Sequence, residues 1–336
     1  MFFMKKVGIY MILLLIAIIF SSCSKAPDEN VEGFVIEDHT KEEGDKDALE
    51  SAKTTIGLVM KTLTNPFFID MELGARKAEE ELGIRLLVRT GAQETSIQQQ
   101  IAIVEELIKL RVDAIVIAPG HSTELIPVLK KAQDAKIAIV NIDNKLDFQI
   151  SKEMGLINVP FISIDNQQGG YEAAKYIADQ VTKPTKAIIL EGILGAKNSE
   201  ERKKGALKAF EENKNIDLVA IETANWKIDE AFSVISQIFK EHPDIGIIFC
   251  ANDMMALGVI EYLVKENKEN VLIAGFDALE EAKKAIRKGA MKVTIDQQAD
   301  LQGYTGVMYA VKMIEGKGVP EKTLIPIKVV DIESLR

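Results

Sequence analysis

A Lys, an Asn and two Phe residues gather in the segment 61–68, which follows the first strand-like apolar run. Lys61 and Asn65 offer a charged group and an amide group, while Phe67 and Phe68 offer aromatic faces. These groups suit a polyol, which presents hydroxyl groups at its edges and C–H groups on its faces. The simpler interpretation is that Asn65 begins a helix and that both Phe rings belong to the core.

Further polar and aromatic residues follow later apolar runs in the same way. Carboxylates and amides form paired hydrogen bonds with vicinal hydroxyl groups, and a guanidinium fork spans two adjacent oxygens. Simpler roles exist, because Asp at a strand end often caps the next helix and a charged run around Arg202 suits a solvated helix face. These strand-end residues include Asp143, Asn144, Arg202, Trp226, Asn252, Asp253, Phe276, Asp277 and Gln297.

The strand-end set has no catalytic signature. Asp143, Asp253 and Asp277 could supply a carboxylate pair for glycoside hydrolysis, but nothing marks one as the acid and another as the base. The sequence has no G-x-S-x-G or Cys-His nucleophile site, and its three His residues lack metal-ligand spacing. We therefore expect a binding protein that is not an enzyme and that uses no metal or cofactor.

The elements that position these residues alternate between strand-like runs and segments with a helical period. Such alternation predicts parallel sheets with helices on both faces, because right-handed crossovers require it. About ten strands fit two sheets better than one, so we expect an α/β fold with two doubly wound parallel-sheet lobes. Ligands of such sheets bind at the carboxyl ends of the strands. The expected strands are 55–60, 84–90, 114–118, 137–142, 161–164, 186–190, 218–222, 246–250, 271–276 and 291–295.

Residues 1–22 have the pattern of an export signal. Lys5 and Lys6 precede an apolar run that is too short to span a membrane comfortably, and small residues then lead to Cys23. Small residues before a cysteine resemble the lipobox of bacterial lipoproteins, which implies cleavage before Cys23 and lipid attachment to its sulfur. An uncleaved anchor and a core strand are the alternatives.

Residues 23–53 are acidic and lack apolar periodicity, which predicts a solvated tether, with a metal site around His39 as the alternative. Removal of 1–22 deletes two of the 41 basic residues and none of the 51 acidic ones, so the mature net charge is 39 − 51 = −12. This charge argues against a nucleic-acid partner. Cys250 alone remains besides Cys23, and its apolar surroundings predict a buried, inert thiol.

Several segments, taken in order and at compatible spacing, resemble the sugar-binding proteins of bacterial ABC transporters, of the ribose-binding type and most of all the allose-binding members. The resemblance covers about residues 54–330. The segments that carry it are 61–67, Ala118 and Pro119 with 141–143, Glu191 and Gly192 with Glu201 and Arg202, 250–253 with Met255 and Ala256, and 275–277.

The resemblance implies a type I binding-protein fold, in which two lobes joined by three crossings close around a sugar. It implies an N-terminal lobe of 54–164 plus 298–322 and a C-terminal lobe of 165–297 plus 323–336. The ligand-binding residues that we predict from it and from the strand ends are Lys61, Asn65, Phe67, Phe68, Asp143, Asn144, Arg202, Trp226, Asn252, Phe276, Asp277 and Gln297.

Departures from the family pattern bear on the choice of sugar. Ribose-binding members have a small hydroxyl residue at the position of Lys61, an Asn at that of Ala118 and an Arg at that of Asn144. Allose-binding members share Lys61 and Ala118 but have an acid at the position of Asn144. We therefore expect a hexose or ketohexose of the allose or psicose kind rather than ribose.

The resemblance also implies a role. We expect an exported, monomeric, lipid-anchored receptor, in the periplasm or at the cell surface, that delivers a monosaccharide to the membrane permease of an ABC transporter. The alternative is a receptor for a sugar or furanosyl signal that docks on a sensor kinase or chemoreceptor. A sugar-responsive transcription regulator shares this core but requires an N-terminal helix-turn-helix, whereas this chain has an export signal and an acidic segment there.

Overall fold

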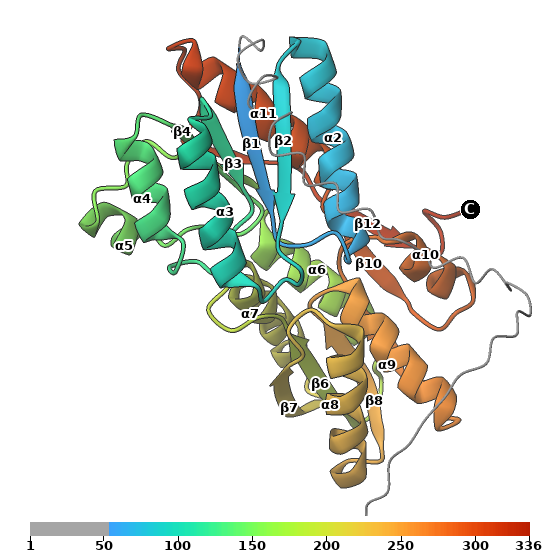
Figure 1. The fold of residues 1–336 in the computed structure, drawn as a ribbon. Helices are drawn as coiled ribbons and strands as arrows, with labels where there is room; N and C mark the ends of the chain where they lie inside the picture. The colour runs from blue at the N-terminus through green and yellow to red at the C-terminus, as the bar shows by residue number, and fades with distance from the viewer. Residues whose placement is uncertain (1–53) are drawn as a thin grey trace, which may run out of the picture. The chain divides into compact units, whose positions relative to one another are not determined.

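The structure is a computed structural model, and it describes residues 54–336. The predicted export signal at 1–22, the tether at 23–53 and the lipidation site Cys23 lie outside the described residues. Within 54–336, two six-stranded sheets are covered by helices (Figure 1). All strand pairs are parallel except the one at the edge of the second sheet, which confirms the predicted doubly wound α/β fold.

The first sheet has the strand order β11-β5-β4-β3-β1-β2. Its strands are β1 (Thr55–Met60), β2 (Arg85–Thr90), β3 (Ala114–Ile117), β4 (Ala138–Ile142), β5 (Phe161–Ser163) and β11 (Lys322–Leu324). Its helices are α2 (Pro66–Leu82), α3 (Ile97–Leu110), α4 (Ile126–Asp134), α5 (Phe148–Glu153) and α11 (Ala299–Ile314).

Both faces of the first sheet are buried, which explains why its strands read as continuous apolar runs. Ile56 and Leu58 belong to the apolar cluster that includes α2, whereas Val59 belongs to the cluster that includes Leu107 of α3. Successive side chains of a strand point to opposite faces, so one strand supplies both clusters.

The second sheet has the strand order β12-β10-β9-β8-β6-β7, with β12 antiparallel to β10. Its strands are β6 (Thr185–Glu191), β7 (Ile216–Thr223), β8 (Ile245–Cys250), β9 (Leu272–Ala274), β10 (Val293–Asp296) and β12 (Lys328–Asp331). Its helices are α6 (Asn166–Ala178), α7 (Lys197–Glu211), α8 (Ile228–Glu241), α9 (Asp253–Lys265) and α10 (Glu280–Arg287). Cys250 is fully buried at the end of β8, as predicted.

The chain crosses between the two sheets three times, after β5, after β10 and after β11. The third crossing differs from the prediction, which divides the lobes between residues 322 and 323. Lys322, Thr323 and Leu324 all pair with β5, so the whole of β11 belongs to the first sheet. Among residues 54–336, no helix is long and apolar enough to cross a membrane.

Two glycines allow α2 and α11 to pack with their backbones in close approach. A Cβ atom at Gly74 would lie 1.9 Å from the carbonyl oxygen of Asp300, and a Cβ atom at Gly303 would lie 2.0 Å from that of Met71. Any larger residue must therefore push the two helices apart. Since α2 begins in the segment 61–68, this packing also fixes where that segment lies.

Gly74→Ala is therefore expected to lower the free energy of unfolding by about 1–3 kcal/mol, although Ala favours a helix by about 1 kcal/mol over Gly. Gly318→Ala is the control, because a Cβ atom there meets nothing within 4 Å and its effect should stay within about 0.5 kcal/mol. Urea denaturation measures both variants. Equal changes in the two would contradict the close approach.

Candidate functional site

One cavity is lined by residues from the carboxyl ends of strands in both sheets, and its lining side chains leave a free volume of about 10 Å³. A larger surface hollow of about 630 Å³ lies around α5 and β11, but none of the predicted binding residues lines it. The cavity is lined by Lys61, Asn65, Phe67, Phe68, Glu94, Asp143, Asn198, Arg202, Trp226, Asn252, Asp277 and Gln297.

The segment 61–68 both begins helix α2 and contributes side chains to the cavity. Asn65 caps α2, because its Oδ1 accepts a hydrogen bond of 3.1 Å from the backbone N–H of Phe67. Its Nδ2 donates to Glu94 Oε1 at 2.9 Å and so faces the cavity. Phe67 and Phe68 are buried with ring centroids 5.0 Å apart in an edge-to-face arrangement. Both rings are core residues and line the cavity as well.

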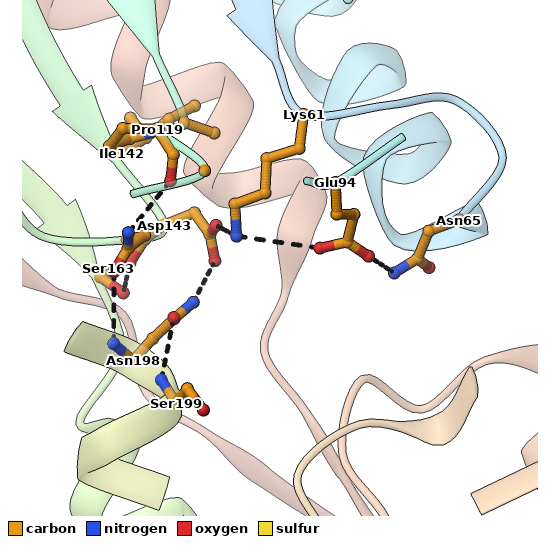
Figure 2. Close-up of polar contacts among 12 residues, drawn as sticks. Lys61, Asn65, Glu94, Pro119, Ile142, Asp143, Ser163, Asn198 and Ser199 are labelled. Atoms are coloured by element: carbon orange, nitrogen blue, oxygen red, sulfur yellow. Dashed lines mark hydrogen bonds and ion pairs between the residues drawn. The ribbon is translucent and has the colours of Figure 1, made fainter. Parts of the chain in front are cut away.

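A row of charged groups forms the first lobe's wall of the cavity (Figure 2). Lys61 Nζ lies 2.7 Å from Asp143 Oδ2 and 4.0 Å from Glu94 Oε2. Desolvation by burial raises the pKa of Glu94, and the Lys61 ammonium group opposes that shift. Because all three groups are buried, their charges interact with a ligand far more strongly than exposed charges would.

Arg202 dominates the second lobe's wall. It is 2% exposed, which excludes the simpler alternative of a solvated helix face. Its Nε donates to Asn166 Oδ1 at 2.8 Å, its Nη1 to the carbonyl oxygen of Ala251 at 2.9 Å and its Nη2 to Gln297 Oε1 at 2.9 Å. Burial lowers the pKa of Arg202, while Asp277 opposes that shift. These bonds hold the guanidinium plane in one orientation toward the cavity.

Asp277 and Gln297 complete this wall. Gln297 Nε2 donates to Asp277 Oδ1 at 2.6 Å, and Arg202 Nη1 lies 3.8 Å from the same oxygen. Burial raises the pKa of Asp277 well above its ordinary value, while the Arg202 charge lowers it. A carboxylate in this position can accept hydrogen bonds from a ligand without leaving a buried charge unpaired.

Trp226 and Asn252 line the cavity from neighbouring loops of the second sheet. Trp226 is buried, and its ring lies so close to Gly192 that a Cβ atom there would come within 2.0 Å of it. Among the described residues, the Trp226 Nε1–H group has no hydrogen-bond acceptor. Asn252 caps α9 by accepting a 2.9 Å hydrogen bond from Met255, so Asn252 and not Asp253 is the capping residue.

Asn144 and Phe276 do not line the cavity. Asn144 is fully buried, and its Oδ1 accepts a 3.2 Å hydrogen bond from the backbone N–H of Asn198. Phe276 lies beneath Arg202, with the guanidinium carbon 3.8 Å from the ring centroid. Both residues thus support groups that line the cavity.

Two lining residues, Glu94 and Asn198, were not predicted. Glu94 lies in the loop after β2, four residues beyond its end at Thr90, and an acid at that distance carries no strand-end signal. Asn198 lies in the first turn of α7, between Gly192 and Arg202, where only the ends of the segment were singled out. Within residues 54–336, no group of His, Cys, Asp and Glu is arranged to hold a metal ion.

Comparison with known proteins agrees with this geometry. Residues 56–318 match the periplasmic binding protein domain family. The chain belongs to that family. The D-ribose/D-allose-binding protein of Pseudomonas aeruginosa is 36% identical over 270 residues, which cover 79% of this chain and 83% of that protein. The D-allose-binding periplasmic protein of Escherichia coli K12 is 32% identical over 283 residues, which cover 83% of this chain and 91% of that protein.

A solved structure is similar as well. It is the periplasmic solute binding protein of an ABC transporter from Actinobacillus succinogenes 130z with bound D-allose. The TM-score is 0.79 at 37% sequence identity, over 84% of this chain and 99% of that one. The predicted family is therefore confirmed. Its members here are binding proteins of transporters, which confirms the prediction that the chain is not an enzyme.

Asp253, next to the cavity, should make stability depend on pH. Burial raises the pKa of Asp253 from 3.8 to about 7. Hydrogen bonds that its carboxylate accepts from Leu279 N–H at 2.9 Å and Thr294 Oγ1 at 2.8 Å lower the pKa, but by less than burial raises it. The folded protein therefore binds a proton that the unfolded chain releases above pH 4. Its free energy of unfolding should fall as the pH rises from about 4 to about 7, and this contribution should be constant above that.

Asp253→Asn is expected to flatten this decrease in urea denaturation measured between pH 4 and pH 8. Asp217→Asn, at an exposed position, controls for the loss of one carboxylate. If wild type and Asp253→Asn lose stability in parallel over this window, the pKa of Asp253 is not raised.

Proposed function

We propose that this protein is the exported, lipid-anchored receptor of a carbohydrate ABC transporter, and that it binds one monosaccharide in the cavity between its lobes. The observation that carries the proposal is the lining of the cavity, in which buried carboxylate, amide, ammonium and guanidinium groups alternate with three aromatic rings. Export and the anchor rest on the apolar segment before Cys23. Membership of the periplasmic binding protein domain family supports the same location and role.

The two walls offer a sugar different groups. The first lobe presents Lys61, Asn65 and Asp143, which can bind hydroxyl groups at one edge of the ring. The second lobe presents Arg202 and Asp277, whose fork and carboxylate can bind adjacent hydroxyl groups at the other edge. Phe67, Phe68 and Trp226 supply apolar surface for the C–H faces. A sugar bound to both walls favours the closed arrangement of the lobes.

A hexose of the allose or psicose kind is the favoured ligand over ribose. Lys61 reaches from the end of β1 to Asp143 and Glu94, so a buried cation with two acids lies where a ribose-type site has a small hydroxyl group. A similar protein at 37% identity was solved with D-allose, which supports an allose-type ligand, whereas the D-ribose/D-allose-binding protein at 36% identity does not separate the two sugars. The additional hydroxyl group of a hexose can satisfy these charges.

Calorimetric titration of the exported protein with D-allose, D-psicose, D-ribose, D-glucose and D-galactose tests the proposal. Saturable one-site binding of D-allose or D-psicose is expected. Arg202→Ala should weaken it at least about tenfold, because the change removes the cation opposite Asp277 and leaves ligand hydroxyl groups without a partner in a dry cavity. Arg287→Ala, in the last turn of α10, is the control. Absence of binding by every monosaccharide at millimolar concentration would contradict the function, and full affinity in Arg202→Ala would contradict the site.

Lys61→Ser tests the choice of sugar separately. The substitution removes the cation that pairs with Asp143 and introduces the small hydroxyl residue of ribose-type sites. The ratio of D-allose to D-ribose affinity should fall by about tenfold, as expected when one buried polar contact distinguishes two ligands. Competition titrations measure this ratio. A uniform loss of affinity for both sugars would show that Lys61 does not determine selectivity.

A further inference from the structure

Helix α7, which carries Arg202, has no capping residue of its own. Its first residue is Lys197, and the preceding Ala196 has no side-chain acceptor. The first backbone N–H groups of any helix lack partners within the helix, and Ser, Thr, Asp or Asn at the preceding position usually accepts from them. The N–H groups of Lys197 and Asn198 must therefore find acceptors elsewhere.

The acceptors come from the other lobe. Ser122 Oγ, in the loop after β3, accepts a 3.0 Å hydrogen bond from the N–H of Lys197. Asn144 Oδ1, in the loop after β4, accepts a 3.2 Å hydrogen bond from the N–H of Asn198. Neither Ser122 nor Asn144 lines the cavity. Two residues of the first lobe thus take the place of the N-cap of a helix in the second.

These acceptors are held rigidly. Within the first lobe, Asn144 Nδ2 donates to the carbonyl oxygen of Pro119 at 3.0 Å and Ser122 Oγ donates to Asn144 Oδ1 at 3.4 Å. The N–H of Ser122 also donates to the carbonyl oxygen of Gly195 in the second lobe at 3.2 Å, a further contact between the lobes. Ser122 is 6% exposed and Asn144 is 0% exposed, so water competes little for their oxygens. Close by, Asn198 Nδ2 donates to Asp143 Oδ1 at 3.3 Å, which joins the helix start to the cavity wall (Figure 2).

We propose that Ser122 and Asn144 are positioning residues that cap α7 only while the lobes are closed on each other. This inference rests on the proposed function and adds a source of closure energy that is separate from ligand contacts. When the lobes part, the N–H groups of Lys197 and Asn198 lose these acceptors. Closure therefore completes the helix that holds Arg202, and sugar affinity depends on two residues outside the cavity.

The test measures D-allose binding and amide exchange in the exported protein. Ser122→Ala should weaken D-allose binding about two- to tenfold, the range expected for loss of one cap, and the loss should appear mainly as faster dissociation. Ser122→Thr keeps the hydroxyl group and should restore most of the affinity. Ser236→Ala is the control, because it removes a hydroxyl group whose 2.9 Å hydrogen bond lies within α8.

Site-resolved hydrogen exchange under saturating D-allose separates capping from a general loss of structure. Ser122→Ala should raise exchange chiefly at the Lys197 amide, and Asn144→Ala chiefly at the Asn198 amide. Unchanged affinity and exchange in both variants, while wild type binds D-allose, would overturn the capping proposal alone. Equal increases of exchange throughout the second lobe would overturn it too. If wild type binds no monosaccharide, the proposed function fails and this inference with it.

Discussion

The buried charge of Arg202 is the constraint on which the rest of the cavity depends. A guanidinium group removed from water is costly unless hydrogen bonds and an opposite charge compensate it. Here the partners are Asn166 from α6, the backbone at the end of β8, and Gln297 at the end of β10, with Asp277 3.8 Å away. Three elements of the second lobe must therefore converge on one side chain, and their convergence forms that lobe's wall.

The first lobe also contains a buried cation, and different groups compensate its charge. Lys61 is buried beside Asp143 and Glu94, so each lobe compensates its own cation with its own acids. Charges also act between the two walls: burial raises the pKa of Glu94 and lowers that of Arg202, and the charge of each group opposes the shift of the other. Closure thus brings together three acids and two cations, and a neutral polyol that binds between them separates the charges without adding one.

The fold could be predicted from the alternation of strand-like apolar runs with segments of helical period, since continuous apolar runs fit strands buried on both faces.

Ten of the residues that line the cavity, from Lys61 to Gln297, were predicted from the rule that ligands bind at the ends of strands. Asn144 and Phe276 do not line the cavity, although each adjoins a residue that does, because both are held in the supporting layer by contacts with other parts of the chain: Asn144 by Pro119 and Asn198, and Phe276 by Arg202. Glu94 was not predicted because it lies in a loop beyond the end of β2, and only tertiary packing of that loop brings its carboxylate to within 4.0 Å of Lys61. The crossing after β11 was misplaced because a three-residue edge strand has too few residues to show a period.

Backbone strain at the cavity follows from the same convergence. Asp143, Trp226 and Asp277 have positive φ angles of 60°, 66° and 120°, which L-residues adopt at a cost of about 1–3 kcal/mol each. Surrounding bonds hold these conformations, as at Asp143, whose carbonyl oxygen accepts from Ser163 Oγ at 2.8 Å and whose N–H donates to Ile162 at 3.1 Å. A strand that ended in relaxed geometry would continue its alternation and turn these side chains away. The strain therefore marks the positions where the chain leaves the sheet so that a carboxylate or a ring faces the cavity.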